Sequence, residues 1–257
     1  MARPRVFFFA NQGHGTVAVK AAMAKGVEIL GVCSAPERPW WRRKLSEFRS
    51  RPYRDPFAAF EHPSRLPGIR HLPSRDLGAV RDFVLSGKPD LVVSCSFHRL
   101  IPADIFQVAA SAYNVHAGLL PERGGGTPNR WAIREGDVET GVTTHVLSSG
   151  FDQGDIIWQE RISIDSEIVW GDLEMRLVPL VDRAVRAIIE GVQEGRSFQR
   201  RPQIPTIQKS YRGEKLADQT ADERARVCRA TLPKFCGFGL ADCRRRDPIG
   251  RPCGRSL

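Results

Sequence analysis

Two polar side chains interrupt an apolar, strand-like segment near the middle of the 257-residue chain. Asn114 and His116 alternate with Tyr113 and Val115, and successive residues of a β-strand point to opposite faces of the sheet. Both polar side chains therefore lie on one face. An amide donates hydrogen bonds and an imidazole exchanges a proton near neutral pH, so this face either pairs them within the core or uses them in a reaction.

The elements before this segment predict a parallel sheet. A strand at 5–10, a helix at 17–25 and a strand at 27–33 form a βαβ unit. The turn inside the unit contains Gly13 and Gly15 but does not complete G-x-G-x-x-G, and no acidic residue ends the second strand to bind a ribose. These features argue against a dinucleotide site.

The later elements continue an α/β pattern, and the last strand is expected to be an antiparallel edge. The sequence predicts a helix at 76–85, a buried strand at 90–95, the Asn114 strand running to 119–121, a short helix opening at 131–133, strands at 141–147 and 155–164, and an amphipathic helix from 173 to about 194. Residues 34 to about 75 predict a long irregular insertion. The loop at 96–102 leaves the carboxyl end of a strand, where open α/β sheets bind ligands.

Composition limits the classes of protein. No run approaches the roughly 20 apolar residues that span a bilayer, and no signal cleavage pattern is visible at the N-terminus, so a cytoplasmic protein is expected. The formal charge of +10 has a local source in an arginine-rich cluster at 38–54, which is either a solvated loop or a site for nucleic acid or phosphate groups. Cys33 and Cys95 are expected to be buried thiols, and the spacing of the other four cysteines supports neither a metal site nor disulfides.

Three separated motifs occur in a fixed order. They are Asn114-x-His116-x-x-Leu119-Leu120-Pro121 with glycine-rich sequence to Pro128 and Trp131-Ala132-Ile133; Gly141-Val142-Thr143-x-His145; and Phe151-Asp152-x-Gly154-Asp155-Ile156-Ile157. Together they resemble the signature of the 10-formyltetrahydrofolate-dependent formyltransferases, nearest to the nucleotide-sugar branch. The resemblance runs from about residue 5 to 195. It implies a Rossmann-like α/β formyltransferase fold, a mostly parallel twisted sheet flanked by helices, with a short irregular C-terminal extension.

The resemblance implies a catalytic set of Asn114, His116 and Asp152. An amine attacks the formyl carbon of the donor, 10-formyltetrahydrofolate, and an oxyanion develops that Asn114 can stabilise by donating a hydrogen bond. His116 can accept the amine proton, and Asp152 can orient the imidazole or relay a proton. Taken singly, His116 is better interpreted as a hydrogen-bonded core histidine and Asp152 as a turn carboxylate; the order of the three motifs favours the catalytic interpretation. His145 matches a strand position of the family, for which a structural role is expected.

The resemblance also implies the binding residues. The donor is expected against the loop Ser96, Phe97, His98, Arg99, Leu100 and Ile101, and the acceptor near Pro128, Asn129 and Trp131. Phe97 and Trp131 are alternatively ordinary core residues. No metal is expected.

The acceptor is expected to be a nucleotide-linked amino sugar, as in lipopolysaccharide or O-antigen biosynthesis. Methionyl-tRNA enzymes of the family carry an additional C-terminal β-barrel, whereas only about sixty residues follow the long helix in this chain. Glycinamide ribonucleotide enzymes carry a different phosphate-binding loop. The hydrolases of the family carry an extra regulatory domain. A methionyl-tRNA-like enzyme remains the alternative, and a catalytically silent or RNA-binding homologue is the alternative of a different class. Homodimerisation is possible.

Two regions are expected along the chain: a catalytic domain at 1–200 and an extension at 201–257. A helix is predicted at 220–231, and the tail from 236, rich in Gly, Arg, Cys and Pro, is expected to be loosely ordered.

Overall fold

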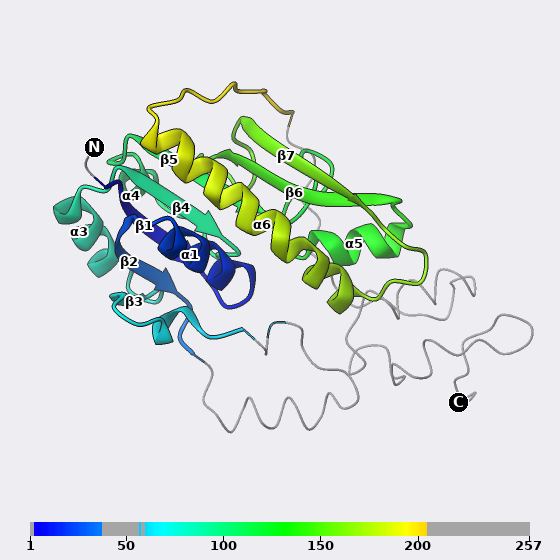
Figure 1. Cartoon of the computed structure of the whole chain (residues 1–257), viewed down its shortest axis with the longest axis horizontal. Helices are drawn as coiled ribbons and strands as arrows, with labels where there is room; N and C mark the ends of the chain where they lie inside the picture. Colours follow the sequence, from blue (N-terminus) through cyan, green and yellow to red (C-terminus); the bar gives the residue numbers. More distant parts are fainter. Residues whose placement is uncertain (1–2, 38–56, 58–59, 205–257) are drawn as a thin grey trace, which may run out of the picture.

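The computed structural model describes residues 3–37, 57 and 60–204, which form one twisted seven-stranded sheet with helices on both faces (Figure 1). The sheet order is β3 (His71–Pro73), β2 (Glu28–Ser34), β1 (Arg5–Ala10), β4 (Leu91–Cys95), β5 (Ser111–His116), β6 (Glu139–Val146) and β7 (Ile156–Ser163). The first five strands are parallel, and β6 and β7 are antiparallel to their neighbours. The predicted Rossmann-like sheet with an antiparallel edge is confirmed.

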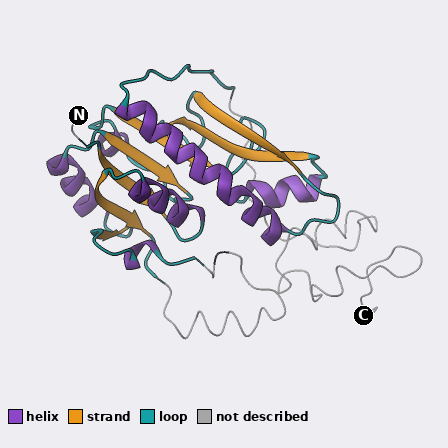
Figure 2. Cartoon of the chain, in the orientation of Figure 1, coloured by secondary structure: helices purple, strands orange, loops and turns teal. Residues whose placement is uncertain are grey.

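Six helices are described, and they divide between the two faces of the sheet (Figure 2). They are α1 (His14–Ala24), the 3-10 helix η2 (Pro63–Arg65), α3 (Leu77–Gly87), α4 (Ala103–Phe106), α5 (Pro128–Glu135) and α6 (Trp170–Gln193). Alternation along β1 builds both cores: Val6 and Phe8 pack beneath α1 and α6, while Phe7 and Phe9 pack against α3 and α4. A central strand buried on both faces is therefore continuously apolar.

Local chemistry sets the helix ends. The Asp76 carboxylate accepts a hydrogen bond of 2.9 Å from the Ala79 N–H and so caps α3, whose end is marked by Lys88 in the left-handed region. Pro128 occupies the first turn of α5, and Gly136, with φ 76°, terminates it. These residues are common start and stop signals, although the helix expected to open at 131–133 begins at Pro128.

Three expectations are corrected. Residues 34–75 are not wholly irregular, because β3 pairs with β2 in parallel and η2 precedes it. The Asn114 strand ends at His116 rather than at 119–121, because the chain turns away there into a buried loop. Helix α1 begins at His14, three residues before the expected start.

Some expectations fall on residues that the structure does not describe. The arginine-rich cluster at 38–54, the helix at 220–231 and the tail from 236 lie in the ranges 38–56 and 205–257. Cys33 and Cys95 are buried and free, as expected, and burial raises the pKa of each thiol to about 12. Within the described residues, no helix is both long and apolar enough to span a bilayer.

Candidate active site

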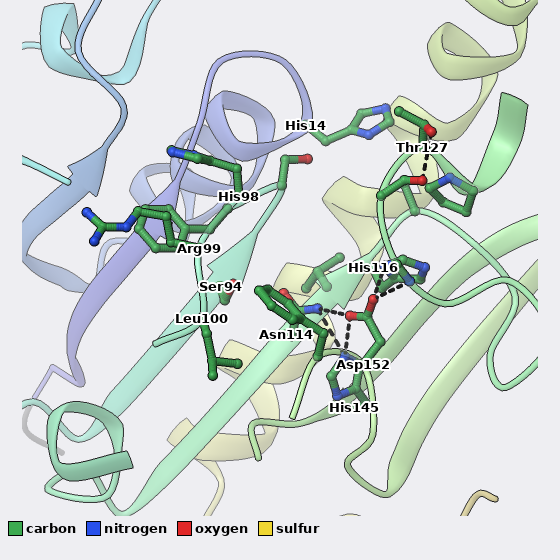
Figure 3. A pocket seen from close by; sticks show the side chains of 18 of the residues that line it. His14, Ser94, His98, Arg99, Leu100, Asn114, His116, Thr127, His145 and Asp152 are labelled. Atoms are coloured by element: carbon green, nitrogen blue, oxygen red, sulfur yellow. Dashed lines mark hydrogen bonds and ion pairs between the residues drawn. The ribbon is translucent and has the colours of Figure 1, made fainter. Parts of the chain in front are cut away.

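A cavity of about 540 Å³ opens at the carboxyl ends of β4 and β5. It lies near the position where the chain leaves β1 and β4 in different directions, which is the usual ligand position in open parallel sheets. The loop that follows β4, the ends of β5 and β6 and the first turns of α1, α5 and α6 all line it. Figure 3 shows that polar side chains from these separate elements converge on this space.

Asp152 is the centre of a buried polar cluster (Figure 3). Its Oδ1 accepts from Asn114 Nδ2 at 3.1 Å and lies 3.3 Å from His145 Nε2. Its Oδ2 accepts from the Gly125 N–H at 2.8 Å and lies 3.5 Å from His116 Nδ1. The structure thus brings the three residues of the predicted catalytic set together around one carboxylate.

Strand alternation and a strained turn produce this convergence. Asn114 and His116 share a face of β5, and β6 presents His145 directly opposite Asn114 in an antiparallel pair. Asp152 lies in the loop between β6 and β7 with φ 53°, a left-handed conformation that Asp tolerates better than most residues. Gly154 completes the turn, because a Cβ at this position would lie 1.8 Å from the Val146 carbonyl oxygen.

The bonding of His116 fixes its tautomer. Its Nε2 lies 2.7 Å from the carbonyl oxygen of Arg123, which can only accept, so Nε2 carries a hydrogen and Nδ1 is the nitrogen that can take up a proton. Arg123 is itself held in place, because its guanidinium donates hydrogen bonds to Asp137 at 2.5 and 2.6 Å and to Glu135 at 2.7 Å. These bonds also fix the position of the Arg123 carbonyl. These hydrogen bonds raise the pKa of Arg123, with that to Asp137 the larger cause.

Electrostatics keeps Asp152 ionised. Burial alone would raise its pKa, but the facing charge of His116, the hydrogen bond and charge of His145 and the Gly125 N–H outweigh it, and the pKa lies well below its ordinary value. A carboxylate that remains charged at every working pH cannot be the resting proton donor. It can hold the two imidazoles and stabilise a positive charge on either.

The loop expected to bind the donor lines the cavity throughout, from Ser96 to Ile101. Its members differ in exposure: Ile101 belongs to the core, Phe97 stacks edge-on against Phe9 at 5.2 Å, and Leu100 is 43 % exposed. The Arg99 guanidinium donates to the Ser74 carbonyl. The apolar side chains on this loop give a surface suited to a flat heteroaromatic ring.

Asn11 holds this loop through hydrogen bonds of its side chain. The sequence did not predict this role. Its amide donates to the Ser96 carbonyl and to His98 Nδ1, each at 2.8 Å, and its Oδ1 accepts from the Ala35 N–H at 2.8 Å. Burial, followed by the charge of Arg99, lowers the pKa of His98, so its Nδ1 is available as an acceptor at neutral pH. A polar residue directly after a buried strand was the available signal.

Only two of the three residues expected to bind the acceptor line the cavity. Pro128 and Asn129 line the cavity, whereas Trp131 does not and instead lies beneath the Arg134 guanidinium, 4.6 Å from its ring centroid. The Asn129 side chain is fully buried and already bonded to Ala117, Glu174 and Thr140. Its bonds position the start of α5 and leave no donor for a ligand.

A second polar cluster in the cavity was not identified from the sequence. Glu174 on α6 is buried, and its Oε1 accepts from Trp170 Nε1 at 2.6 Å and from Asn129 Nδ2 at 3.1 Å. His14 donates from Nε2 to the Glu174 backbone carbonyl at 2.9 Å, and its Nδ1 lies 3.7 Å from the carboxylate. Phe57 packs edge-on against both His14 and Trp170. Glu174 gave no signal beyond a charged residue within an amphipathic helix.

Comparison with known proteins identifies the family. Residues 6–187 match the formyl transferase family. The chain belongs to this family. Among sequence relatives, a methionyl-tRNA formyltransferase from Pelotomaculum thermopropionicum is 30% identical over 205 residues, which are 78% of this chain and 61% of that protein. This formyl transferase chain spans about 60% of the length of the first such relatives.

Solved structures of formyltransferases share the fold. A 4-N formyltransferase from Francisella tularensis matches with a TM-score of 0.62 at 20% identity, over 88% of this chain and 87% of that one. An N-formyltransferase from Helicobacter canadensis, in complex with folinic acid and dTDP-3-aminofucose, matches with a TM-score of 0.62 at 16% identity, over 90% and 80% of the two chains.

Proposed function

We propose that this chain transfers the formyl group of 10-formyltetrahydrofolate to a primary amine. The observation that carries the proposal is the Asp152 cluster, in which an amide donor, an imidazole with a defined proton-accepting nitrogen and an ionised carboxylate meet at the edge of the cavity. Acyl transfer to an amine needs these three functions.

Each residue has a distinct role in the proposed reaction. The amine nitrogen attacks the formyl carbon, forming a C–N bond, and the carbonyl electron pair moves to oxygen. Asn114 Nδ2 donates to Asp152 Oδ1 and lies 3.0 Å from His145 Nε2; in the reaction it turns the hydrogen that faces His145 to this oxyanion and keeps the other on Asp152. His116 Nδ1 takes the proton that the amine loses, and Asp152 Oδ2, 3.5 Å away, stabilises the imidazolium. The C=O bond then reforms, the bond to the folate nitrogen breaks, and the imidazolium returns the proton to that nitrogen.

The loop Ser96–Ile101 is proposed to hold the donor. In support, it lines the cavity beside Asn114, and the Helicobacter canadensis neighbour was crystallised with folinic acid. Leu100 and Phe97 supply apolar contact for the heteroaromatic ring, and backbone groups of the loop supply its hydrogen bonds. His98, whose Nδ1 is already bonded to Asn11, contributes only its Nε2–H.

The acceptor is proposed to be the amino group of a nucleotide-linked amino sugar. In support, the Helicobacter canadensis N-formyltransferase was crystallised in complex with dTDP-3-aminofucose, and another solved neighbour is a sugar 3N-formyltransferase crystallised in the presence of dTDP. A wall of the same cavity carries Phe57 and Trp170, which pack edge-on against each other and form an aromatic surface that can stack a ring. Pro128 continues this wall.

Initiator methionyl-tRNA is the second candidate acceptor. The observation that favours it is the 30% identity to methionyl-tRNA formyltransferases over 78% of the chain. The same cluster would act on the methionyl amino group, so only the acceptor distinguishes the two candidates.

One assay tests both the reaction and the acceptor. Purified protein is incubated with 10-formyltetrahydrofolate and, separately, with dTDP-, GDP- and UDP-linked amino sugars and with charged initiator tRNA, and formylated acceptor is detected by mass spectrometry. His116→Ala is the control. Formylation of a sugar that is lost in His116→Ala supports the proposal; formylation of the tRNA alone selects the second candidate. Tight folate binding without transfer to any acceptor would contradict a formyltransferase acting on these amines.

A further inference from the structure

The chain returns to the sheet after α6 and reaches the loop that carries Asp152. Arg201 and Ile156, the first residue of β7, exchange backbone hydrogen bonds of 2.8 and 2.9 Å in an antiparallel bridge. The segment that forms this bridge follows the end of α6, as Figure 1 shows. Two residues later, the side chain of Gln203 lies against the Asp152 turn. This segment falls in the region expected from the sequence to be an extension separate from the catalytic domain.

Gln203 holds the Asp152 turn at two points. Its Nε2 donates to the carbonyl oxygen of Asp152 at 3.0 Å and to that of Gly154 at 2.6 Å. A single amide thus uses both of its hydrogens on the two carbonyls that flank Gln153. Gln203 Oε1 is buried and has no hydrogen-bond partner within the described residues. The contact therefore depends on the donor half of the amide, and its oxygen remains unsatisfied.

The hydrogen bonds from Gln203 matter because the backbone of the Asp152 turn is in an unfavourable conformation. Asp152 has φ 53°, which is unfavourable for a residue with a Cβ, and Gly154 has no space for one. Without the two hydrogen bonds, the backbone of the turn can relax toward more favourable angles. A small movement of this backbone carries both carboxylate oxygens away from His116 Nδ1 at 3.5 Å and His145 Nε2 at 3.3 Å.

We propose that Gln203 is a positioning residue: its amide, anchored by the Arg201 bridge, fixes the turn so that the Asp152 carboxylate stays aligned with His116. The inference deepens the proposed function, because it rests on the role of Asp152 in formyl transfer. It also assigns a function to a segment that follows the last helix of the described fold.

The kinetic test compares three variants. Gln203→Met keeps the length of the side chain without a donor, Gln203→Glu keeps its shape but opposes two carbonyl oxygens with a carboxylate, and Arg201→Ala keeps the backbone bridge of the same segment. Both Gln203 variants are expected to lower kcat about tenfold or more at nearly unchanged KM for the folate donor, because a displacement near 1 Å can cost that much. Arg201→Ala is expected to keep wild-type kcat. An equal loss in Arg201→Ala would overturn the proposal in favour of simple anchoring.

The pH profile provides a readout that a purely structural role would not move. His116 on β5 and His145 on β6 face Asp152 and lower its pKa, together with the Gly125 N–H from the loop after β5. When the turn relaxes in Gln203→Met, these contacts lengthen and the pKa of Asp152 rises. Because a depressed pKa contributes stability that is lost on acidification, the unfolding free energy is expected to fall less between neutral pH and pH about 3 in both Gln203 variants than in wild type or Arg201→Ala. An unchanged acid dependence of stability in the Gln203 variants contradicts the proposal.

Amide hydrogen exchange separates this inference from the proposed function. The Gly125 N–H donates to the Asp152 side chain, whereas Gln203 bonds the backbone carbonyls of Asp152 and Gly154. Exchange of the Gly125 N–H is expected to be at least several-fold faster in Gln203→Met than in wild type or Arg201→Ala, whether or not the protein transfers a formyl group. Wild-type exchange at Gly125 in both Gln203 variants would overturn the inference even if the enzyme is active. An inactive wild type with the expected exchange pattern would instead sink the proposed function alone.

Discussion

Two buried carboxylate–histidine pairs line the same cavity, and they are built differently. In one, Asp152 faces His116 at 3.5 Å; in the other, Glu174 faces His14 at 3.7 Å. Their carboxylate side chains are similarly buried, at 10% and 6% exposed. Residue type and burial alone therefore do not distinguish a pair suited to chemistry from one suited to structure.

The partners and the backbone make the difference. Glu174 faces one imidazole, that of His14; its hydrogen bonds come from the indole of Trp170 and the amide of Asn129, and the carboxylate projects from a 24-residue helix. Asp152 instead lies between two imidazoles on a turn in a left-handed conformation. A proton-exchanging partner and a strained turn are features of functional sites. The comparison supports the proposal that the Asp152 pair takes part in proton transfer and that the Glu174 pair positions its neighbours.

The largest expected effect comes from Asp152→Asn. The variant keeps the shape of the side chain but removes the charge that stabilises an imidazolium at His116, so kcat/KM for formyl transfer is expected to fall about 10³-fold. Folate binding, measured by fluorescence titration, is expected to remain near wild type. The exposed Asp165→Asn serves as the matched control. Retention of more than a tenth of the activity would break the assignment of proton transfer to this pair.

Glu174→Gln is expected to have a smaller effect on turnover and a clear effect on stability. The new side chain can still accept from Trp170, but the charge facing His14 is lost and an amide N–H₂ is buried in its place. We expect activity to fall less than tenfold and the free energy of unfolding to fall by about 1 to 3 kcal/mol. Chemical denaturation and the formyl-transfer assay measure the two quantities. A loss of activity equal to that of Asp152→Asn at unchanged stability would remove the distinction between the pairs.

The stability contributed by Asp152 depends on pH in a defined direction. Its pKa is lower in the folded protein than in the unfolded chain, so its contribution is fully present above the unfolded value near 4 and is lost as the pH falls through the lower folded pKa. The difference in unfolding free energy between wild type and Asp152→Asn is therefore expected to be constant between pH about 5.5 and 8 and to shrink below about pH 4. A difference that grows on acidification would contradict the depressed pKa.

Trp170→Phe should have the smallest effect on activity. It removes the N–H that donates to Glu174 Oε1 at 2.6 Å but keeps an aromatic ring against Phe57. We expect unfolding free energy to fall by about 1 to 2 kcal/mol and kcat to change by no more than about twofold, because the lost bond is to a structural carboxylate. A large loss of kcat would show that the position of Glu174 matters to the reaction.

Much of the fold could be predicted from the chain because its elements carry strong local signals. The apolar runs at β1 and β4, the Asp76 cap and the periodicity of α6 each identify an element to within a few residues. β3 was not predicted, because a three-residue strand has almost no periodicity of its own and is defined by its pairing with β2. The start of α1 was predicted too late in the chain, because His14 is positioned by a contact with α6, which is distant in the sequence.

The sequence by itself determined which residues could do chemistry, because alternation placed Asn114 and His116 on one face and motif order added Asp152. Only the tertiary structure decided their protonation and their neighbours. The Arg123 carbonyl selects the tautomer of His116, His145 joins the cluster through the β5–β6 register, and Gln203 reaches the Asp152 turn from beyond the last helix. These contacts join residues 7 to 51 positions apart, and hydrogen bonds over such separations follow from packing, which no local pattern records.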